Sequence, residues 1–292
     1  MREEAKSRGF KFQVTQPEYF ELIVDNHGKT RLFYKEKPFT LPDIFIPRFA
    51  VTYFAHMITR YFEQAGPLVI NKALSRQMAK DKLLTLQCLA QKNLPVPKSI
   101  LAKFPLNKGL IESELSYPIV LKKTEGSEGK GILLCENQGQ LEDVMEMFEE
   151  STDTGRLNLI LQEFISTKIG RDIRVFVIGD KVIGAMLRTG KAGDFKANYS
   201  GGGTVEAFPL NPEIEALALE STKALGLQIA GVDILFDKTS YRICEVNASP
   251  YFEGFEKATG IDVAKAIFDY LEDEMLKKGK KNEAKKSLRN SR

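Results

Sequence analysis

The sequence YRICEVNASP, residues 241–250, alternates as a β-strand does and ends in a polar cluster. Successive side chains of a strand point to opposite faces, so Tyr241, Ile243, Glu245 and Asn247 share one face. That face changes from apolar to acidic and then to amide just before a Ser-Pro turn. The preceding strand supplies a partner for this acid and amide.

The stretch IAGVDILF, residues 229–236, is predicted to form the other strand of a hairpin. If Asp233 lies opposite Glu245, the connecting loop consists of residues 238–240. This register puts Asp233, Glu245 and Asn247 on one face, and a slip of one residue would send Asp233 to the other face. Three oxygen ligands at a strand end suit Mg²⁺, which takes one or two carboxylates together with substrate phosphates. The alternative is a pair of surface carboxylates on a hairpin.

The glycine-rich stretch TEGSEGKG, residues 124–131, connects two predicted strands and lacks the GK[ST] ending of a Walker loop. Such a loop can fold over phosphates and offer backbone N–H groups. Lys122 precedes the loop, and Lys82 lies on an amphipathic helix predicted over residues 76–93. Lysine acts as a point charge for phosphate. The alternatives are an ordinary hairpin turn and two solvated lysines.

The remaining predicted elements mix helices with hairpins. They are a short buried strand at 41–48, strands at 117–123, 131–136 and 158–165, a hairpin at 173–188 with its turn at Gly179-Asp180, a helix at 213–226 closed by Gly226, and a final helix around 263–271. This mixture predicts α+β lobes and not a continuous βαβ winding.

Composition narrows the class of protein. With 292 residues and 43% hydrophobic content the chain is long enough for roughly two globular domains. No N-terminal run resembles a signal peptide, and the most apolar region, 44–62, is too polar to span a bilayer. The three cysteines lie far apart, so a disulfide framework or a zinc cluster is not expected. We expect a reduced, cytoplasmic protein without membrane contact, and a homo-oligomer.

The net charge of +3 divides unevenly along the chain. Residues 277–292 hold eight Lys or Arg and one Glu, which gives +7, and the remaining 34 basic and 38 acidic residues give −4. The body is therefore mildly acidic and the end is basic. We expect a disordered basic tail, with contact to an anionic surface such as nucleic acid as the alternative.

The run LQEFI…GRDIRVFVIGDKVIGAMLR…GDFKAN…GVDIL…EVNASP…EG.EK.TGID resembles the ATP-grasp ligases, and among them the RimK-like amino-acid (glutamate) ligases. The resemblance covers about 41–271 and is densest over 117–265. It implies two α+β lobes that grip ATP, preceded by a small α/β domain. Because MREEAKSRGF already has the pattern of the first helix, we expect the first strand of that domain to be absent or to precede the sequence. The implied domains are an N-terminal domain at 1–75, a small ATP-grasp lobe at 76–159, a large lobe with the metal site at 160–272, and the basic tail at 273–292.

The resemblance also implies a role for each residue that matches a family motif. The nucleotide-binding set holds the phosphates, the adenine and the ribose, and consists of Lys82, Lys122, Gly126, Ser127, Gly129, Gln162, Glu163, Phe164, Ile165, Asp172 and Lys196. The catalytic set, near phosphate or substrate, consists of Arg174, Arg188 and Lys196. The metal set consists of Asp233, Glu245 and Asn247, which would hold two Mg²⁺ ions, with Mn²⁺ as a substitute. For the two arginines the alternative is a hairpin salt bridge.

The implied reaction is an ATP- and Mg²⁺-dependent ligation through an acyl phosphate, with release of ADP and phosphate. Its substrates would be an amino acid, with glutamate as the candidate, and an amine or the C-terminus of a peptide or protein. The alternatives are a glutathione-synthetase-like small-peptide ligase and a non-catalytic ATP-binding regulatory protein. Relatives carry an arginine where this chain has NYSGGG, 198–203, and Gly-Leu where it has Tyr251-Phe252. We therefore expect a less positive substrate pocket and weak use of free glutamate.

Overall fold

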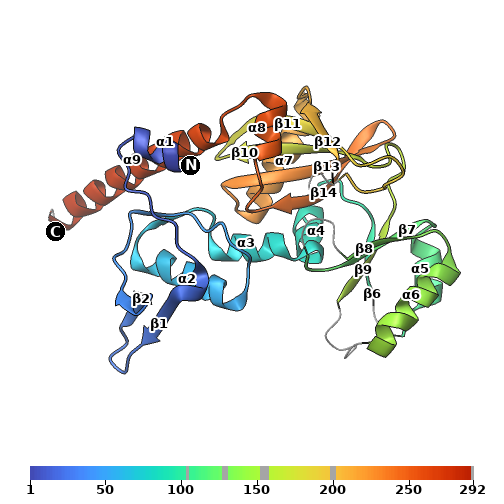
Figure 1. Ribbon diagram of the computed structural model, residues 1–292, viewed down its shortest axis with the longest axis horizontal. Coiled ribbons are helices and arrows are strands. Elements are labelled where there is room, and N and C mark those ends of the chain that lie inside the picture. The colour runs from blue at the N-terminus through green and yellow to red at the C-terminus, as the bar shows by residue number, and fades with distance from the viewer. Residues whose placement is uncertain (103–104, 127–130, 152–157, 198–201, 291–292) are drawn as a thin grey trace.

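The structure is a computed structural model that describes residues 1–102, 105–126, 131–151, 158–197 and 202–290, except for the side chains of 149–151 and 280–290 (Figure 1). Three parts are visible in Figure 1: an N-terminal part, a small lobe around β6–β9, and a large lobe around β10–β14. The helices α3 and α4 run between them. This arrangement agrees with the α+β fold expected from the sequence.

The N-terminal part combines a small antiparallel sheet with a βαβ unit. Its elements are α1 (Arg2–Ser7), a 3₁₀ turn (Pro17–Tyr19), β1 (Phe20–Val24), β2 (Thr30–Tyr34), β3 (Lys37–Pro38), β4 (Ile44–Phe45), α2 (Tyr53–Ala65) and β5 (Leu68–Val69). The strands β4 and β5 pair in parallel, with α2 as the crossover. Phe20, Phe45 and Phe62 are buried together in the core of this part. The buried strand predicted at 41–48 is thereby confirmed as β4.

The small lobe is a four-stranded antiparallel sheet in the order β6-β9-β7-β8. Its elements are β6 (Ser99–Ala102), α5 (Lys108–Glu114), β7 (Ile119–Lys123), β8 (Ile132–Cys135), α6 (Gln138–Ser151) and β9 (Leu159–Glu163). Leu121 and Leu161 pack against α5 and α6. Because side chains alternate along a strand, their neighbours Lys122 and Gln162 lie on the opposite face. The sheet continues to Glu163, past the boundary expected at 159.

The large lobe is a five-stranded antiparallel sheet in the order β12-β11-β10-β13-β14. Its strands are β10 (Arg171–Ile178), β11 (Lys181–Thr189), β12 (Thr204–Ala207), β13 (Ile229–Asp237) and β14 (Ser240–Asn247), and its helices are α7 (Pro212–Leu225), α8 (Glu253–Thr259) and α9 (Val263–Asn290). Val175 and Val177 pack on the side of α7, whereas Phe176 and Ile178 pack on the side of α8 and α9. The turn at Gly179 and the αL cap at Gly226 are confirmed.

The single helix predicted over 76–93 is wrong. The segment forms two helices, α3 (Ala73–Lys80) and α4 (Lys82–Ala90), separated by Asp81 in an extended conformation. The Asp81 side chain accepts a hydrogen bond from Leu84 N at 3.0 Å and so caps α4. Aspartate in a helical pattern competes with the backbone in this way. The break makes Lys82 the first residue of α4.

The C-terminal segment also differs from its prediction, because α9 continues as a helix to Asn290 where a disordered tail was expected. Its lysine-, glutamate- and alanine-rich composition favours helix, and Lys277 pairs with Glu274 one turn earlier at 2.7 Å. At its start α9 packs on α1, where Arg8 pairs with Asp269 at 2.7 Å and with Glu272 at 2.9 Å. Throughout the described part of the chain, no helix has the length and apolar character needed to cross a membrane.

Candidate active site between the lobes

The β13–β14 hairpin brings the predicted metal-binding residues together. Asp233 lies opposite Glu245, and Gly231 lies opposite Asn247, so the register predicted at the site is confirmed. The predicted three-residue loop is wrong, because Asp237 pairs with Ser240 and leaves a two-residue turn.

A register shift next to Asp233 reconciles these two findings. Ile234 pairs with Ile243, so Cys244 is the extra residue of a bulge. Lys238 takes a positive φ of 40° in the short turn. The bulge therefore combines a tight turn with an Asp233–Glu245 pair.

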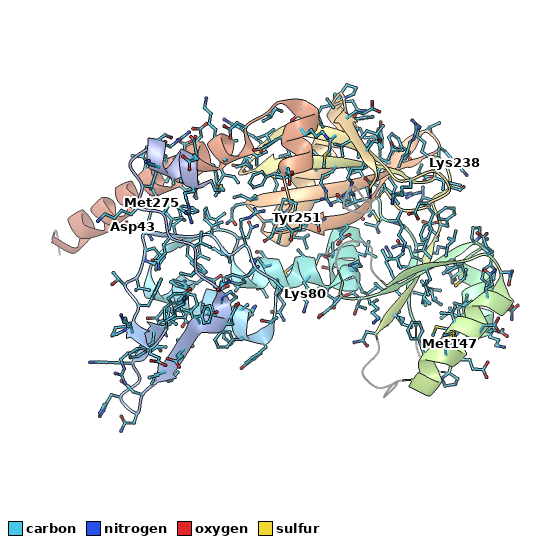
Figure 2. The ribbon with its side chains drawn as sticks, viewed as in Figure 1. Asp43, Lys80, Met147, Lys238, Tyr251 and Met275 are labelled. Carbon is cyan, nitrogen blue, oxygen red and sulfur yellow. The ribbon has the colours of Figure 1, made fainter. Side chains whose placement is uncertain are left out.

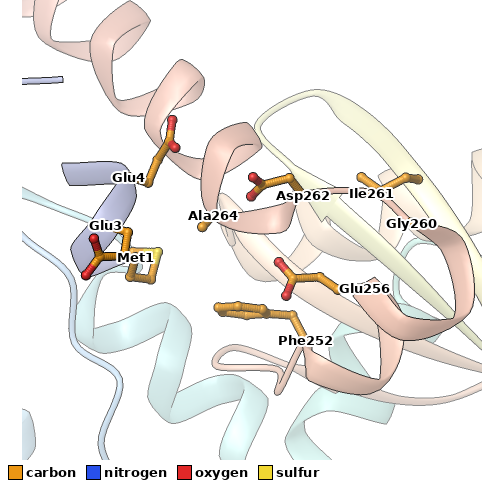
Figure 3. Close-up of a pocket in the computed structure, with 9 residues that line it drawn as sticks. All are labelled: Met1, Glu3, Glu4, Phe252, Glu256, Gly260, Ile261, Asp262 and Ala264. Carbon is orange, nitrogen blue, oxygen red and sulfur yellow. The ribbon is translucent and has the colours of Figure 1, made fainter. Parts of the chain in front are cut away.

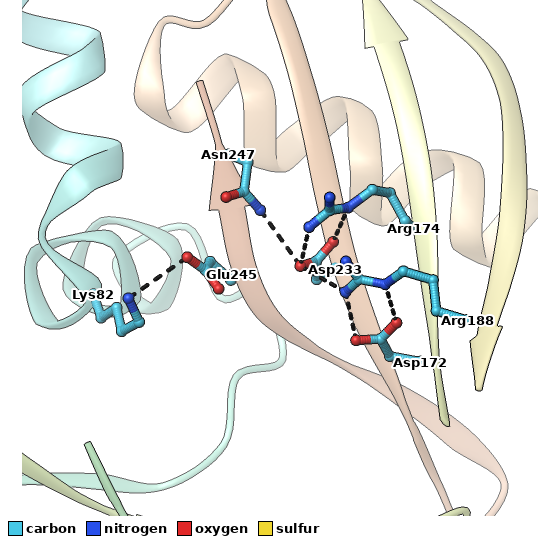
Figure 4. Close-up of polar contacts among 7 residues, drawn as sticks. All are labelled: Lys82, Asp172, Arg174, Arg188, Asp233, Glu245 and Asn247. Atoms are coloured by element: carbon cyan, nitrogen blue, oxygen red, sulfur yellow. Dashed lines mark hydrogen bonds and ion pairs between the residues drawn. The ribbon is translucent and has the colours of Figure 1, made fainter. Parts of the chain in front are cut away.

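Asp233 lies at the centre of a network of buried ion pairs (Figure 4). Arg174 donates to both of its oxygens, from Nε and Nη2, at 2.7 Å each. Arg188 Nη2 lies 2.9 Å from Asp233 Oδ2, and Arg188 also binds both oxygens of Asp172 at 2.6 Å. Asn247 Nδ2 donates to Asp233 Oδ2 at 3.4 Å. The hairpin salt bridge that was the alternative is thus present for Arg188, which pairs with Asp172 across the β10–β11 hairpin, whereas Arg174 pairs with a strand outside its hairpin.

Strand pairing explains why these partners meet. Arg174 lies opposite Asp233 across β10 and β13, and Asp172 lies opposite Arg188 across β10 and β11. Burial alone would raise the pKa of Asp233, but the charges of Arg174 and Arg188 outweigh burial and hold that pKa below its ordinary value. Asp233 is therefore ionised at neutral pH. Asp172, expected near the ribose, has both carboxylate oxygens bound by Arg188.

Lys82 connects the metal-binding strand to the glycine-rich stretch. Its backbone N donates to Thr124 O at 2.8 Å, and its Nζ donates to Gly126 O at 3.0 Å. The same Nζ lies 3.6 Å from Glu245 Oε1. Ser127 and Gly129, also expected to bind phosphate, lie outside the described residues.

Lys122 offers a second cation near β14, since its charge acts on Cys244, the neighbour of Glu245. It is 5% exposed and lies on the face of β7 opposite the α5 and α6 core. Among the described residues, no Asp or Glu forms an ion pair with it. A buried lysine without a carboxylate partner is suited to an anionic ligand such as phosphate.

The end of β9 has its side chains fixed by neighbours. Gln162 Nε2 donates to Ser99 Oγ at 2.7 Å, and Glu163 Oε1 accepts from Lys98 N at 2.6 Å. Both side chains are therefore engaged by β6 and the residue before it.

A cavity of about 560 Å³ opens beside this segment and is lined by Pro118, Leu134, Glu136, Phe164, Ser166, Ile169, Gly193 and Phe195. Its residues come from both lobes. Phe164 and Phe195 meet edge to face with centroids 6.3 Å apart, and Lys196 Nζ lies 5.3 Å from the Phe195 ring. Apolar and aromatic walls of this size suit a small planar ligand. Ile165 is half-buried and follows Phe164.

The donor set fits a magnesium ion that arrives with phosphate. Asp233, Glu245 and Asn247 offer the oxygen ligands that Mg²⁺ prefers. Within the described ranges, no three His, Cys, Asp or Glu residues form a ready cage for a metal. Phosphate oxygens would have to complete the coordination.

The charges of the site also favour a magnesium ion that is bound together with phosphate. Three carboxylates face three cations in the ion pairs described above: Asp172, Asp233 and Glu245 against Arg174, Arg188 and Lys82. A balanced cluster does not attract a bare divalent cation strongly. A complex of Mg²⁺ with a polyanion has the charge that this cleft, with its further cation Lys122, accommodates.

A second depression of about 410 Å³ is acidic and lies between α1, α8 and the start of α9 (Figure 3). Glu3, Glu4, Glu256 and Asp262 line it beside Phe252. Two of these carboxylates are bound to backbone N–H groups, Glu256 to Val263 at 3.0 Å and Asp262 to Lys265 at 2.8 Å. These two hydrogen bonds satisfy backbone N–H groups in the first turn of α9, so Glu256 and Asp262 serve to cap that helix.

Sequence reasoning missed a buried asparagine that positions the loop after β14. Asn71 Nδ2 donates to Ile229 O at 2.6 Å and to Ala248 O at 2.8 Å. Gly231 allows the same loop to approach, because a Cβ there would lie 2.9 Å from Pro250 Cβ. The sequence signal for Asn71 was weak, since one asparagine after a short apolar run is typical of any turn.

Comparisons with known proteins agree with this geometry. Residues 79–271 match the family model described as RimK-like ATP-grasp domain. A probable alpha-L-glutamate ligase of Haemophilus influenzae is 35% identical over 281 residues, covering 93% of this chain and 92% of that protein. A probable alpha-L-glutamate ligase of Vibrio atlanticus is 37% identical over 271 residues, covering 91% and 88%.

A solved structure shares the fold at lower identity. The ATP-grasp ligase PsnB, complexed with a phosphomimetic variant of its minimal precursor, Mg and ADP, has a TM-score of 0.71 and 22% identity, covering 92% of both chains. The family model and the two relatives span the lobes and the network around Asp233. The chain belongs to the RimK-like ATP-grasp family and is an ATP-dependent ligase that forms carbon–nitrogen bonds.

Proposed function

We propose that this ligase joins an amino acid, with glutamate as the first candidate, to an amine or to the C-terminus of a peptide or protein. The observation that carries the proposal is the shared face of Asp233, Glu245 and Asn247, with Lys82 joining it to the glycine-rich stretch. The names of the two relatives support glutamate.

The reaction proceeds in two transfers. A carboxylate oxygen of one substrate attacks the γ-phosphorus of ATP, the bond to the β-phosphate oxygen breaks, and ADP leaves. The amine nitrogen of the other substrate then attacks the acyl carbon, phosphate leaves with the bonding electron pair, and the nitrogen loses a proton. This route is needed because a free carboxylate is a poor electrophile.

The lysines and arginines of the site stabilise the negative charge of the phosphates and of the transferred phosphoryl group. Lys82 and Lys122 hold the phosphates, and Lys196, next to the Phe164–Phe195 cavity, lies near the transferred group. Arg174 and Arg188 act through Asp233, because they hold its carboxylate in one orientation. Such preorganised charges are the main source of rate enhancement in phosphoryl transfer.

Asp233, Glu245 and Asn247 would hold Mg²⁺, and a bound ion would supply positive charge that offsets the charge of the phosphates. We propose two ions, as three ligands on a strand end and several phosphate oxygens allow, with Mn²⁺ as a substitute. The adenine lies against Phe164, Ile165 and the backbone of Gln162 and Glu163.

The deciding experiment is ADP release with ATP and Mg²⁺ across the twenty amino acids, singly, in pairs and with peptides that have a free C-terminus. We expect ADP release that depends on the added substrate and a product heavier by one residue in mass spectrometry. ATP binding without substrate-dependent ADP release would refute ligation and favour a regulatory nucleotide-binding protein.

A further inference from the structure

Two arginines outside the network around Asp233 lie together without a carboxylate partner. Arg76, on α3, is 2% exposed, whereas Arg48, which follows β4, is exposed to solvent. Burial and the nearby charge of Arg48 lower the pKa of Arg76 to about 10. Although Arg48 as a residue is exposed, neighbouring protein atoms partly desolvate its guanidinium and lower its pKa, and Tyr251 acts against this shift. Phe49, the residue after Arg48, connects the two, because the Arg76 guanidinium lies over its ring with Cζ 4.8 Å from the centroid.

The hydrogen bonds of the two guanidinium groups leave their charge unmatched. Arg76 Nη2 donates to Phe49 O, while the buried Arg76 Nε has no partner among the described residues. Arg48 Nη2 donates to Pro250 O at 2.7 Å and its Cζ lies 5.2 Å from the Phe252 ring centroid. In the described chain neither arginine forms an ion pair with Asp or Glu. Buried cations are normally paired, so an external anion is the missing partner.

The position of the pair connects it to the active site. Pro250, which accepts from Arg48, comes three residues after the metal-set residue Asn247 and packs over Gly231, the partner of Asn247 in the sheet. Figure 2 shows Tyr251, the next residue, between α3 and the large sheet. Along the chain, the helix that carries Arg76 is followed by Asp81 and then by Lys82, the first residue of α4. Arg48 therefore contacts the loop that follows the metal set, and Arg76 lies against Phe49, the residue after Arg48.

We propose that Arg48 and Arg76 bind a carboxylate of the substrate that stays free during the reaction, so that the substrate is a dicarboxylic amino acid such as glutamate. A guanidinium group presents the planar fork that matches a carboxylate. The nucleotide phosphates are the other possible anion, but Lys82 and Lys122 serve them. The pair supplies, from the segment after β4 and from α3, the positive charge that the sequence of 198–203 lacks, and it replaces the expectation of weak glutamate use. The inference rests on the proposed function.

Binding can test the site without turnover. Arg48→Met is the main variant because its side chain is exposed, and Arg31→Met, an exposed arginine on β2, is the matched control. The probes are L-glutamate, L-glutamine and L-isoglutamine, measured by calorimetry in the presence of AMPPNP and Mg²⁺. Wild type and Arg31→Met should bind glutamate about 10- to 100-fold more tightly than at least one of the two amides. Arg48→Met should lose that preference and keep the affinity for AMPPNP.

Several outcomes would overturn the site. These are an unchanged glutamate preference in Arg48→Met, no binding of glutamate to the wild type, and weaker AMPPNP binding in Arg48→Met, which would assign the arginines to nucleotide phosphate. Glutamate affinity should fall from the wild type to Arg76→Lys and further to Arg76→Met. Circular dichroism checks that both variants are folded. ADP release then separates the two proposals. If Arg48→Met loses the glutamate preference but the wild type releases no ADP, the anion site is supported and the proposed ligation is refuted. Normal ADP release with an unaffected Arg48→Met refutes the anion site alone.

Discussion

Replacement of Glu245 by Gln tests the metal assignment with little change in shape. The substitution keeps the size of the side chain and removes one of three negative charges in a balanced cluster. The loss of a preorganised charge at the transferred phosphate should cost at least about 3 kcal/mol of transition-state stabilisation. At 1.36 kcal/mol for each factor of ten, ADP formation should slow by about 150-fold or more.

The effect on stability should be small by comparison. Glu245 is ion-paired with Lys82 at 3.6 Å, and the two side chains are 29% and 9% exposed. A partly exposed pair of this length contributes up to about 1 kcal/mol. The melting temperature should therefore fall by at most about 4 °C, since 1 kcal/mol shifts a chain of this size by about 2–4 °C. The large kinetic loss and small thermal loss distinguish a metal ligand from a structural carboxylate.

Asp237→Asn is the matched control in the same hairpin. Asp237 pairs with Arg242 at 2.9 Å, and its side chain is 17% exposed, but it lies at the far end of β13. ADP release and thermal unfolding are measured for both variants over a range of Mg²⁺ concentrations. The control should lose a similar amount of stability and keep its turnover. Turnover of Glu245→Gln within threefold of wild type at ordinary Mg²⁺ would refute the metal assignment.

The other predictions concern the buried arginine, the metal, acid stability and the basic helix. Arg188→Met leaves Asp172 and Asp233 without their shared cation, so it should destabilise the fold by about 3–5 kcal/mol, seen as a fall of at least about 6 °C in melting temperature; an unchanged value would contradict a buried network. Mg²⁺ without nucleotide should give little heat in calorimetry, whereas Mg²⁺ with AMPPNP should bind, and tight binding of Mg²⁺ alone would show that the site is not charge-balanced. The depressed pKa of Asp233 contributes stability that is present above its unfolded pKa of about 3.9 and is lost as pH falls through the lower folded value, so the stability difference between wild type and Asp233→Asn should shrink only below about pH 4. Truncation of residues 280–292 should leave AMPPNP affinity unchanged, and a weaker affinity would place the end of α9 in the catalytic body.

Local patterns in the sequence were enough to find the central hairpin. A period of two puts Asp233 and Glu245 on a shared face, and only one register satisfies both strands. Gly226 marked the end of α7, because a left-handed cap favours glycine. The family motifs added the fold of the two lobes and the use of ATP. These features depend on neighbours in the chain or on pairs within one hairpin.

Other features depend on how separate segments pack. Asp81 breaks a helix that periodicity alone continues, because its side chain caps the next helix. The bulge at Cys244 could not be predicted from the sequence, because polar and apolar residues alternate regularly on both sides of it.

The ion pairs and the arginine site required the tertiary structure. Arg174, Asp233 and Arg188 come from three neighbouring strands, so their contacts follow from the strand order of the sheet. Arg48 and Arg76 come from segments that the sequence separates by a whole helix, and Arg48 also contacts Pro250, about 200 residues later. Charges act through space and are strengthened by burial, and both distance and burial are set only when the chain has folded. The sequence by itself therefore determined that Asp233 and Glu245 lie opposite each other in the hairpin, and the tertiary structure decided which cations surround them.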